Sequence, residues 1–159
     1  MSKPTFICVP GASHSPLIFD PVKSTLAYYG YEVTPIALPS VGGNPATYDF
    51  TEDVRAIRNL VAQYADSGRD VILVMHGYGG LPGAEALHGL GKAEREQRGL
   101  RGGVIRLVFI MSVCMPSFLS PLLRFAQSRL SLSSQTRLLK VTHCLKVAVL
   151  LNKLFSNQH

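Results

Sequence analysis

The stretch VILVMHGYGG, residues 71–80, decides the fold class. Its first five residues, Val71 to Met75, form an apolar run that is typical of a buried strand, and they lead directly into His76 and a glycine-rich turn. Residues 81–90 can continue as a helix, because Pro82 is tolerated in the first turn of a helix. A strand, a sharp turn and a helix in this order indicate an α/β protein with a parallel sheet.

Comparable segments lie on both sides of this stretch. Three further apolar runs predict strands at residues 5–9, 31–38 and 105–112, and helical patterns cover residues 20–29 and 51–68. Strands that are apolar throughout and alternate with helices predict a sheet of about four parallel strands with helices on both faces. Residues 92–102 are rich in charge and are predicted as a solvated connection.

Length and charge predict one compact domain followed by a tail. The chain has 159 residues, of which 47% are hydrophobic and 16% charged, which excludes a disordered protein. Residues 1–96 contain seven Lys and Arg and all ten acidic residues, whereas residues 97–159 contain nine Lys and Arg and no acid. We therefore expect a domain body at residues 1–115 and a divergent, Leu- and Ser-rich basic tail at residues 116–159.

Three interpretations of the tail stay open. Residues 138–155 mix apolar residues with lysines, as a helix on an anionic membrane surface would, although the lysines are poorly aligned on one face. Residues 145–151 could instead form a makeshift strand that covers the edge of the sheet. The abrupt onset of the tail and its lack of acids favour a third origin, a splicing or gene-model product. Its aromatic residues are too sparse to predict nucleic-acid binding.

The three cysteines and the hydropathy indicate the compartment. Cys8, Cys114 and Cys144 are an odd, widely spaced set, so we expect no disulfide framework, no metal site and a reducing, cytoplasmic environment. The longest nearly apolar stretch, residues 107–115, is about half the length that a membrane-spanning helix needs. No cofactor is expected, and the oligomeric state is open.

Three loops carry a family resemblance. Residues 10–14, PGASH, follow the first predicted strand; residues 39–43, PSVGG, follow the second; and residues 75–80, MHGYGG, follow the third. These segments resemble the α/β-hydrolase superfamily, in particular the small esterase-like branch that includes plant methylester esterases and hydroxynitrile lyases. The resemblance covers residues 4–115 and implies a partial α/β-hydrolase fold, with its four strands in the spatial order second, first, third, fourth.

The same resemblance exposes a missing nucleophile. In the superfamily the turn after the third strand holds a serine at the top of the sheet, and position 77 of this chain is glycine. No Asp or Glu follows Glu96, and His143 and His159 are interpreted as incidental tail histidines. The resemblance thus implies an ancestral ester or amide hydrolase that is catalytically inactive in this chain.

An oxyanion site can survive this loss, because backbone donors do not depend on the absent side chains. The resemblance places it at the N–H groups of Ala12 and Tyr78, for a small ester-like or carbonyl ligand. The other candidates for the surrounding pocket are Gly11, Ser13, His14, His76 and Gly79. His14 and His76 either hydrogen-bond the ligand or simply pack and position their loops.

Two other functions are kept as alternatives. The chain can be a non-catalytic small-molecule-binding or vestigial protein. It can also be a dinucleotide-binding α/β domain, since Gly77, Gly79 and Gly83 between a strand and a helix form a relaxed version of that fingerprint. Against this, no acid that would hold a ribose ends the next strand at residues 110–112.

Overall fold

The computed structural model describes residues 3–44 and 47–112. They form four strands, β1 (Thr5–Val9), β2 (Glu32–Pro35), β3 (Asp70–His76) and β4 (Gly103–Ile110). Between the strands lie the helices α1 (Asp20–Tyr28), α2 (Thr51–Asp66), α3 (Gly80–Ala86) and α4 (Lys92–Gln97), and the short 3₁₀ helices η1 (Pro16–Phe19) and η2 (Gly77–Gly79). The predictions for residues 116–159, including the strand at 145–151, lie outside the described residues.

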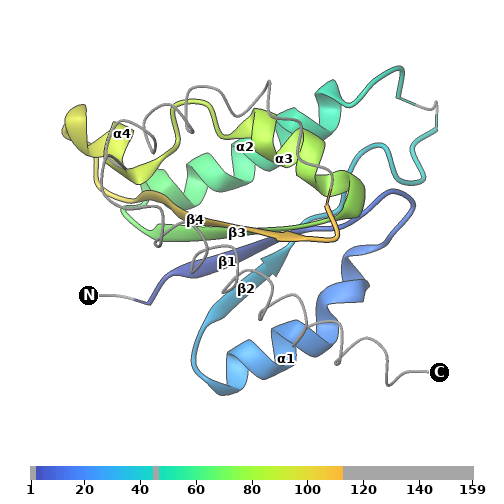
Figure 1. The fold of residues 1–159 in the computed structure, drawn as a ribbon, viewed down its shortest axis with the longest axis horizontal. Helices are drawn as coiled ribbons and strands as arrows, with labels where there is room; N and C mark the ends of the chain where they lie inside the picture. The colour runs from blue at the N-terminus through green and yellow to red at the C-terminus, as the bar shows by residue number, and fades with distance from the viewer. Residues whose placement is uncertain (1–2, 45–46, 113–159) are drawn as a thin grey trace, which may run out of the picture. The chain divides into compact units, whose positions relative to one another are not determined.

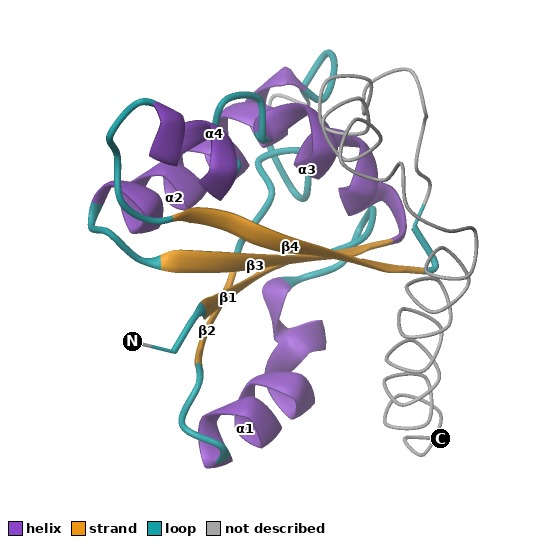
Figure 2. Cartoon of the chain, turned by 60° about the vertical axis from the view of Figure 1, so that its left-hand side comes forward, coloured by secondary structure: helices purple, strands orange, loops and turns teal. Residues whose placement is uncertain are grey.

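The strands make one all-parallel sheet in the order β2-β1-β3-β4. β1 lies between two partners, with Ile7 opposite Thr34 of β2 and Leu73 of β3. Figure 1 shows α1 on one face of this sheet and α2, α3 and α4 on the other, and Figure 2 shows the four strands side by side between these two layers. The predicted fold class and strand order are confirmed.

The main core lies between the sheet and the layer of α2 and α3. Alternate β3 residues, Val71, Leu73 and Met75, are fully buried there. α2 contributes Ile57, Val61 and Ala65, whose spacing of four residues places them on one helical stripe. This core also includes residues of β1 and α3 and residues 36 and 38, just after β2, and it therefore fixes the carboxyl ends of the strands relative to one another.

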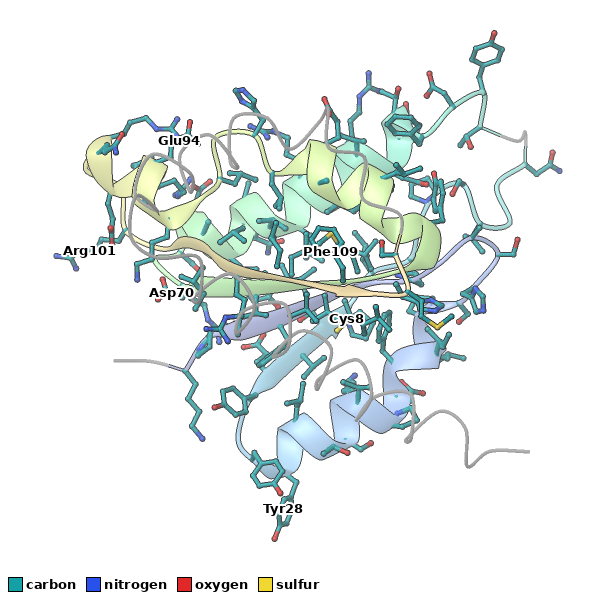
Figure 3. The ribbon with its side chains drawn as sticks, in the orientation of Figure 1. Cys8, Tyr28, Asp70, Glu94, Arg101 and Phe109 are labelled. Atoms are coloured by element: carbon teal, nitrogen blue, oxygen red, sulfur yellow. The ribbon has the colours of Figure 1, made fainter. Side chains whose placement is uncertain are left out.

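The opposite face of the sheet buries a smaller set of side chains beneath α1. Cys8 on β1 lies on this face, whereas Phe109 on β4 lies toward α2 and α3 (Figure 3). Phe19 and Val22 from the η1–α1 segment are also buried. Tyr28, near the end of α1, is 86% exposed and points away from the sheet (Figure 3).

Several element boundaries differ from the sequence-based prediction. The second strand is shorter than predicted and ends at Pro35 instead of residue 38, although the Ile36 N–H still donates to the Cys8 carbonyl at 3.0 Å. α3 ends at Ala86 instead of residue 90, because the chain turns at Gly89, whose φ is +77°. The last strand is residues 103–110, two residues earlier at both ends, and Met111 leaves it with a φ of +44°.

The predicted solvated connection at residues 92–102 is mostly exposed, but it is more ordered than the sequence indicated. This segment contains α4, and the side chain of Arg95 in it is buried. The Arg95 guanidinium donates to the carbonyl of Gly102 at 3.1 Å and to the Asp66 carboxylate at 2.7 Å. Buried arginines are rare unless they are paired, so local sequence composition alone did not indicate this contact.

Candidate functional site

The candidate site lies where β1 and β3 end. The β1 loop, residues 10–16, and the β3 turn, residues 76–80, both follow the carboxyl ends of adjacent parallel strands, where open α/β sheets bind ligands. The β1 loop begins with a turn in which the His14 N–H donates to the Gly11 carbonyl at 3.2 Å. Within this turn Ser13 has a φ of +60°, an unusual value for a non-glycine residue.

Gly77 occupies the sharp point of the β3 turn. Its φ is +51°, in the left-handed region that glycine adopts without steric cost. A Cβ built on Gly77 would lie 3.8 Å from Cα of Gly11, its nearest neighbour, which is an ordinary contact distance. The strained turn expected between β3 and the following helix is therefore present, and it leaves room for the side chain that glycine lacks.

Position 79 requires glycine for a different physical reason, which is close packing. A Cβ at this position would lie 2.6 Å from the carbonyl oxygen of Pro10 and 2.8 Å from a methyl group of Val9. Glycine is thus required for the helix after the turn to pack against the end of β1. The atoms that approach Gly79 belong to this chain. Packing against the end of β1 therefore explains this glycine without a bound dinucleotide.

The β3 turn provides backbone N–H groups at the start of a helical segment. The N–H groups in the first turn of a helix have no intrahelical acceptor, and Tyr78 lies in the first turn of the η2–α3 segment. At the other side of the site, Ala12 is exposed at the tip of the β1 loop. The opposite flank of the turn is held by Ser112, whose hydroxyl donates to the Gly77 carbonyl at 2.8 Å.

His14 of the β1 loop and His76 at the end of β3 come together. Their ring centroids are 5.6 Å apart and the rings meet edge to face at 88°. Nδ1 of His14 lies 2.8 Å from the Ala12 carbonyl, which can only accept, so this nitrogen carries the hydrogen and Nε2 is left with its lone pair. Nδ1 of His76 is buried and has no hydrogen-bond partner among the described residues.

Gly11 is the residue that lets both imidazoles approach. A Cβ at Gly11 would lie 3.0 Å from Nδ1 of His76 and 3.3 Å from Nδ1 of His14. Burial lowers the pKa of His76, and the neighbouring His14 lowers it further. Both effects disfavour the charged form, so His76 is neutral near pH 7.

The structure adds three residues that the sequence did not single out, namely Asp53, Ser40 and Ser112. Asp53, in the first turn of α2, is fully buried and accepts hydrogen bonds from the Ser40 N–H at 2.9 Å, the Ser40 hydroxyl at 2.6 Å and the Tyr78 hydroxyl at 2.7 Å. Ser112, described above, is the third. Asp53 was visible only as part of a helix start, and Ser40 only as part of a family-like loop.

In chemical terms the site offers backbone donors and two adjacent imidazoles, but no hydroxyl at the point of the turn. Among residues 3–44 and 47–112, no three His, Cys, Asp or Glu side chains form a group that could hold a metal ion. Within the same residues, no helix is both long enough and apolar enough to cross a membrane.

The parallel sheet in the order β2-β1-β3-β4 defines an α/β protein. The glycine turn after β3 lies at the carboxyl end of that strand, the side of the sheet where such proteins bind ligands. A model of the alpha/beta hydrolase family matches residues 6–153, and the chain belongs to this family. The match extends beyond residue 115, where the sequence analysis placed the end of the domain body.

Two fungal relatives match most of this chain and part of their own length. The alpha/beta hydrolase nvfD of Aspergillus novofumigatus is 36% identical over 116 residues, which cover 73% of this chain and 46% of the relative. The probable hydrolase R7 of a Phoma species is 29% identical over 116 residues, which cover 71% of this chain and 44% of the relative. The chain therefore spans a little under half the length of these relatives.

Solved structures share the fold at lower identity. Tomato methylketone synthase I, in complex with 2-tridecanone, superposes with a TM-score of 0.55 at 18% identity, covering 84% of this chain and 50% of the synthase. Polyneuridine aldehyde esterase superposes with a TM-score of 0.55 at 18% identity, covering 79% of this chain and 48% of the esterase. Both agree with the partial α/β-hydrolase fold described above.

Proposed function

We propose that this chain is a catalytically silent member of the alpha/beta hydrolase family that retains a binding site for small ester-like or carbonyl molecules. The observation that carries the proposal is Gly77, which occupies the point of the β3 turn with a φ of +51° and provides no hydroxyl. An acyl-enzyme requires an oxygen or sulfur nucleophile at the reacting carbonyl, and a hydrogen atom cannot serve.

The proposed binding donors are the N–H groups of Ala12 and Tyr78. Support for Tyr78 comes from its place in the first turn of a helix segment, where N–H groups lack internal acceptors. Support for Ala12 comes from its exposure next to the Gly11–His14 turn. Two backbone donors directed at one oxygen would hold a ligand carbonyl without any contribution from a serine.

The proposed compartment is cytoplasmic, as the sequence analysis expected. The described cysteine, Cys8, is a free thiol inside the fold, which is compatible with a reducing environment. Fractionation of cells that express the chain, followed by detection with an antibody, tests this part of the proposal; recovery in a secreted fraction would contradict it.

Catalytic silence is tested with a chromogenic short-chain ester and a serine-reactive phosphonate. We expect no saturable turnover and no covalent label within residues 10–80. Ser13→Ala and Ser15→Ala serve as controls, because these two residues are the serines of the β1 loop. Saturable turnover that is lost in either variant, together with labelling of that serine, would overturn the proposal.

The variant Gly77→Ser tests whether the hydroxyl at residue 77 is the one catalytic group that the site lacks. The side chain has room beside Gly11, so we expect a folded protein. Triad residues act as a unit, and in a serine protease loss of the serine or the histidine alone costs about 10⁶ in kcat. We therefore expect this variant to gain little activity; efficient turnover would show that a base is already in place.

Retained binding is measured by nuclear magnetic resonance on the full chain. A short methyl ketone and a short methyl ester are titrated while the amide signals of Ala12 and Tyr78 are followed. We expect both amides to shift together and saturably, with little change at His88, an exposed histidine that serves as reference. Absence of any saturable shift would reject the binding function and favour a vestigial protein.

A further inference from the structure

The imidazole pair supplies a feature that the proposed function does not use. A Cβ at residue 77 would have only one described neighbour within 4 Å, Cα of Gly11 at 3.8 Å, so this position has room for a side chain. The rings of His14 and His76 meet with their centroids 5.6 Å apart, and both lie close to Gly11.

The hydrogen-bond partners of the pair assign its free atoms. His14 uses Nδ1 on the Ala12 carbonyl, which leaves Nε2 available as a base. His76 has its Nδ1 buried without a partner among the described residues. The pair therefore offers Nε2 of His14 and one ring nitrogen of His76 with a lone pair, and either can accept a proton and then donate a hydrogen bond.

No carboxylate of the described residues is among the causes that shift the pKa of His76. His14 is the titratable neighbour that acts on His76 from the β1 loop. From β4, Ile110 pairs with His76 and Ser112 approaches the turn, and neither side chain is ionisable near pH 7. On the turn itself, the Tyr78 hydroxyl is engaged by Asp53.

We propose that the His14–His76 pair makes this a site for small carboxylic acids, bound as carboxylates together with one proton taken up by the pair. This rests on the proposed binding function and names its ligand class. The carboxylate accepts hydrogen bonds from the backbone donors and supplies the counter-charge that the free pair lacks. A second proton is excluded because two imidazolium ions at this separation repel each other.

The physical consequence is a coupling between affinity and pH. In the free site His76 resists protonation because of burial and because of His14. A bound carboxylate raises the proton affinity of the pair, so binding takes up a proton and strengthens as pH falls from about 8 toward 6. Uptake of one proton changes the dissociation constant by at most about tenfold per pH unit, and the gain levels off once the free pair is itself protonated.

The experiment titrates the full chain with butyrate, hexanoate and benzoate, each compared with its own amide at pH 6, 7 and 8. The amides have the shape of the acids without the charge. Calorimetry in two buffers of different ionisation enthalpy reports the protons taken up, and the imidazole proton resonances of His14 and His76 report where they go. We expect carboxylates to bind with a pH slope and the amides to bind weakly with none.

Variants identify the pair as the origin of the slope. We expect His14→Gln and His76→Gln each to abolish proton uptake, and His88→Gln, at an exposed position, to leave it unchanged. The resonance titration of the unmodified chain gives the same information should a variant fail to fold. A slope that survives in both folded variants overturns the proposal.

The outcomes separate this inference from the proposed function. Equal, pH-independent binding of acids and amides would reject the carboxylate site and leave the carbonyl-binding function standing. Failure of acids, amides, ketones and esters alike to bind would reject both. Carboxylate binding with proton uptake at His14 or His76 supports both.

Discussion

The Tyr78 hydroxyl donates a 2.7 Å hydrogen bond to Oδ2 of Asp53, which joins the β3 turn to the first turn of α2. Ser40 donates to the same carboxylate through its N–H and its hydroxyl, so the loop after β2 is bound to it as well. One fully buried side chain thus holds together three segments that are distant in sequence. The backbone donor that we assign to Tyr78 depends on this connection for its orientation.

Replacement of the buried carboxylate should destabilise the domain. An amide in Asp53→Asn has one acceptor oxygen for three donors, and a buried donor left without a partner costs about 1–3 kcal/mol. We expect a loss of free energy of unfolding in this range, measured by urea denaturation. Asp20→Asn, which alters an exposed carboxylate, should change stability by no more than about 0.5 kcal/mol. Equal effects of the two variants would contradict the role of Asp53.

The Tyr78–Asp53 hydrogen bond should make stability depend on alkaline pH. Burial, the hydrogen bond to Asp53 and the charge of Asp53 raise the pKa of Tyr78 to about 12. The usual value is about 10, so the unfolded chain loses this proton first as pH rises. The stabilisation is therefore complete below about pH 10 and is lost as pH rises toward about 12.

A comparison with Tyr78→Phe isolates this effect from other groups that titrate at high pH. The difference in free energy of unfolding between the original chain and the variant should be constant from pH 7 to 9 and should shrink above that range. A difference that stays constant up to the alkaline limit of folding would show that the hydroxyl does not retain its proton more tightly in the folded state.

The two glycines of the β3 turn should respond differently to alanine. Gly77→Ala places a methyl group at an ordinary contact distance from Gly11 and incurs mainly the cost of a positive φ, about 1–2 kcal/mol. Gly79→Ala drives a methyl group to 2.6 Å from the Pro10 carbonyl, so the turn must move away from β1. We expect Gly79→Ala to be the more destabilising in thermal denaturation, since overpacking costs about 1–3 kcal/mol and occasionally more. The reverse order would show that this contact relaxes easily.

Arg95 and Arg98 provide a matched pair in α4 and just after it. The Arg95 side chain is 6% exposed and bonds to Gly102 and Asp66, whereas the Arg98 side chain is 51% exposed. Arg95→Ala removes packing and a buried hydrogen bond, for which we expect a loss of about 1–3 kcal/mol. Arg98→Ala should cost less than about 1 kcal/mol, as is usual for exposed ion pairs. Similar values in urea denaturation would mean that α4 contributes little to the fold.

Cys8 should be chemically inert in the folded domain. Burial raises the pKa of its thiol to about 12, and the side chain has no exposed surface. Because the thiolate is the reactive form, an alkylating reagent at pH 8 should not modify Cys8 unless the chain unfolds. Peptide-resolved mass spectrometry with and without urea measures this. Rapid labelling of Cys8 without denaturant would show that the α1 layer opens readily.

The positions of the strands and of the main helices along the chain could be predicted from the sequence, because the signals for them are local and periodic. Apolar runs such as residues 71–75 are long enough to define strands, and helix α2 is marked by its apolar stripe and its acidic first turn. The order β2-β1-β3-β4 came from the family resemblance of three loops. Precise ends escaped prediction where a tertiary contact or a positive φ decides them, as at Gly89 and Met111.

The site was only partly visible in the sequence. The absence of a hydroxyl at Gly77 is a property of the residue itself, and so are the two histidines that follow β1 and end β3. Whether those histidines meet, which nitrogen each has free, and which carboxylate holds Tyr78 are decided by segments 25 to 62 residues apart, which only the folded chain brings into contact. The sequence determines the type of each side chain, whereas the distances between side chains, their burial and their hydrogen-bond partners arise from packing in three dimensions.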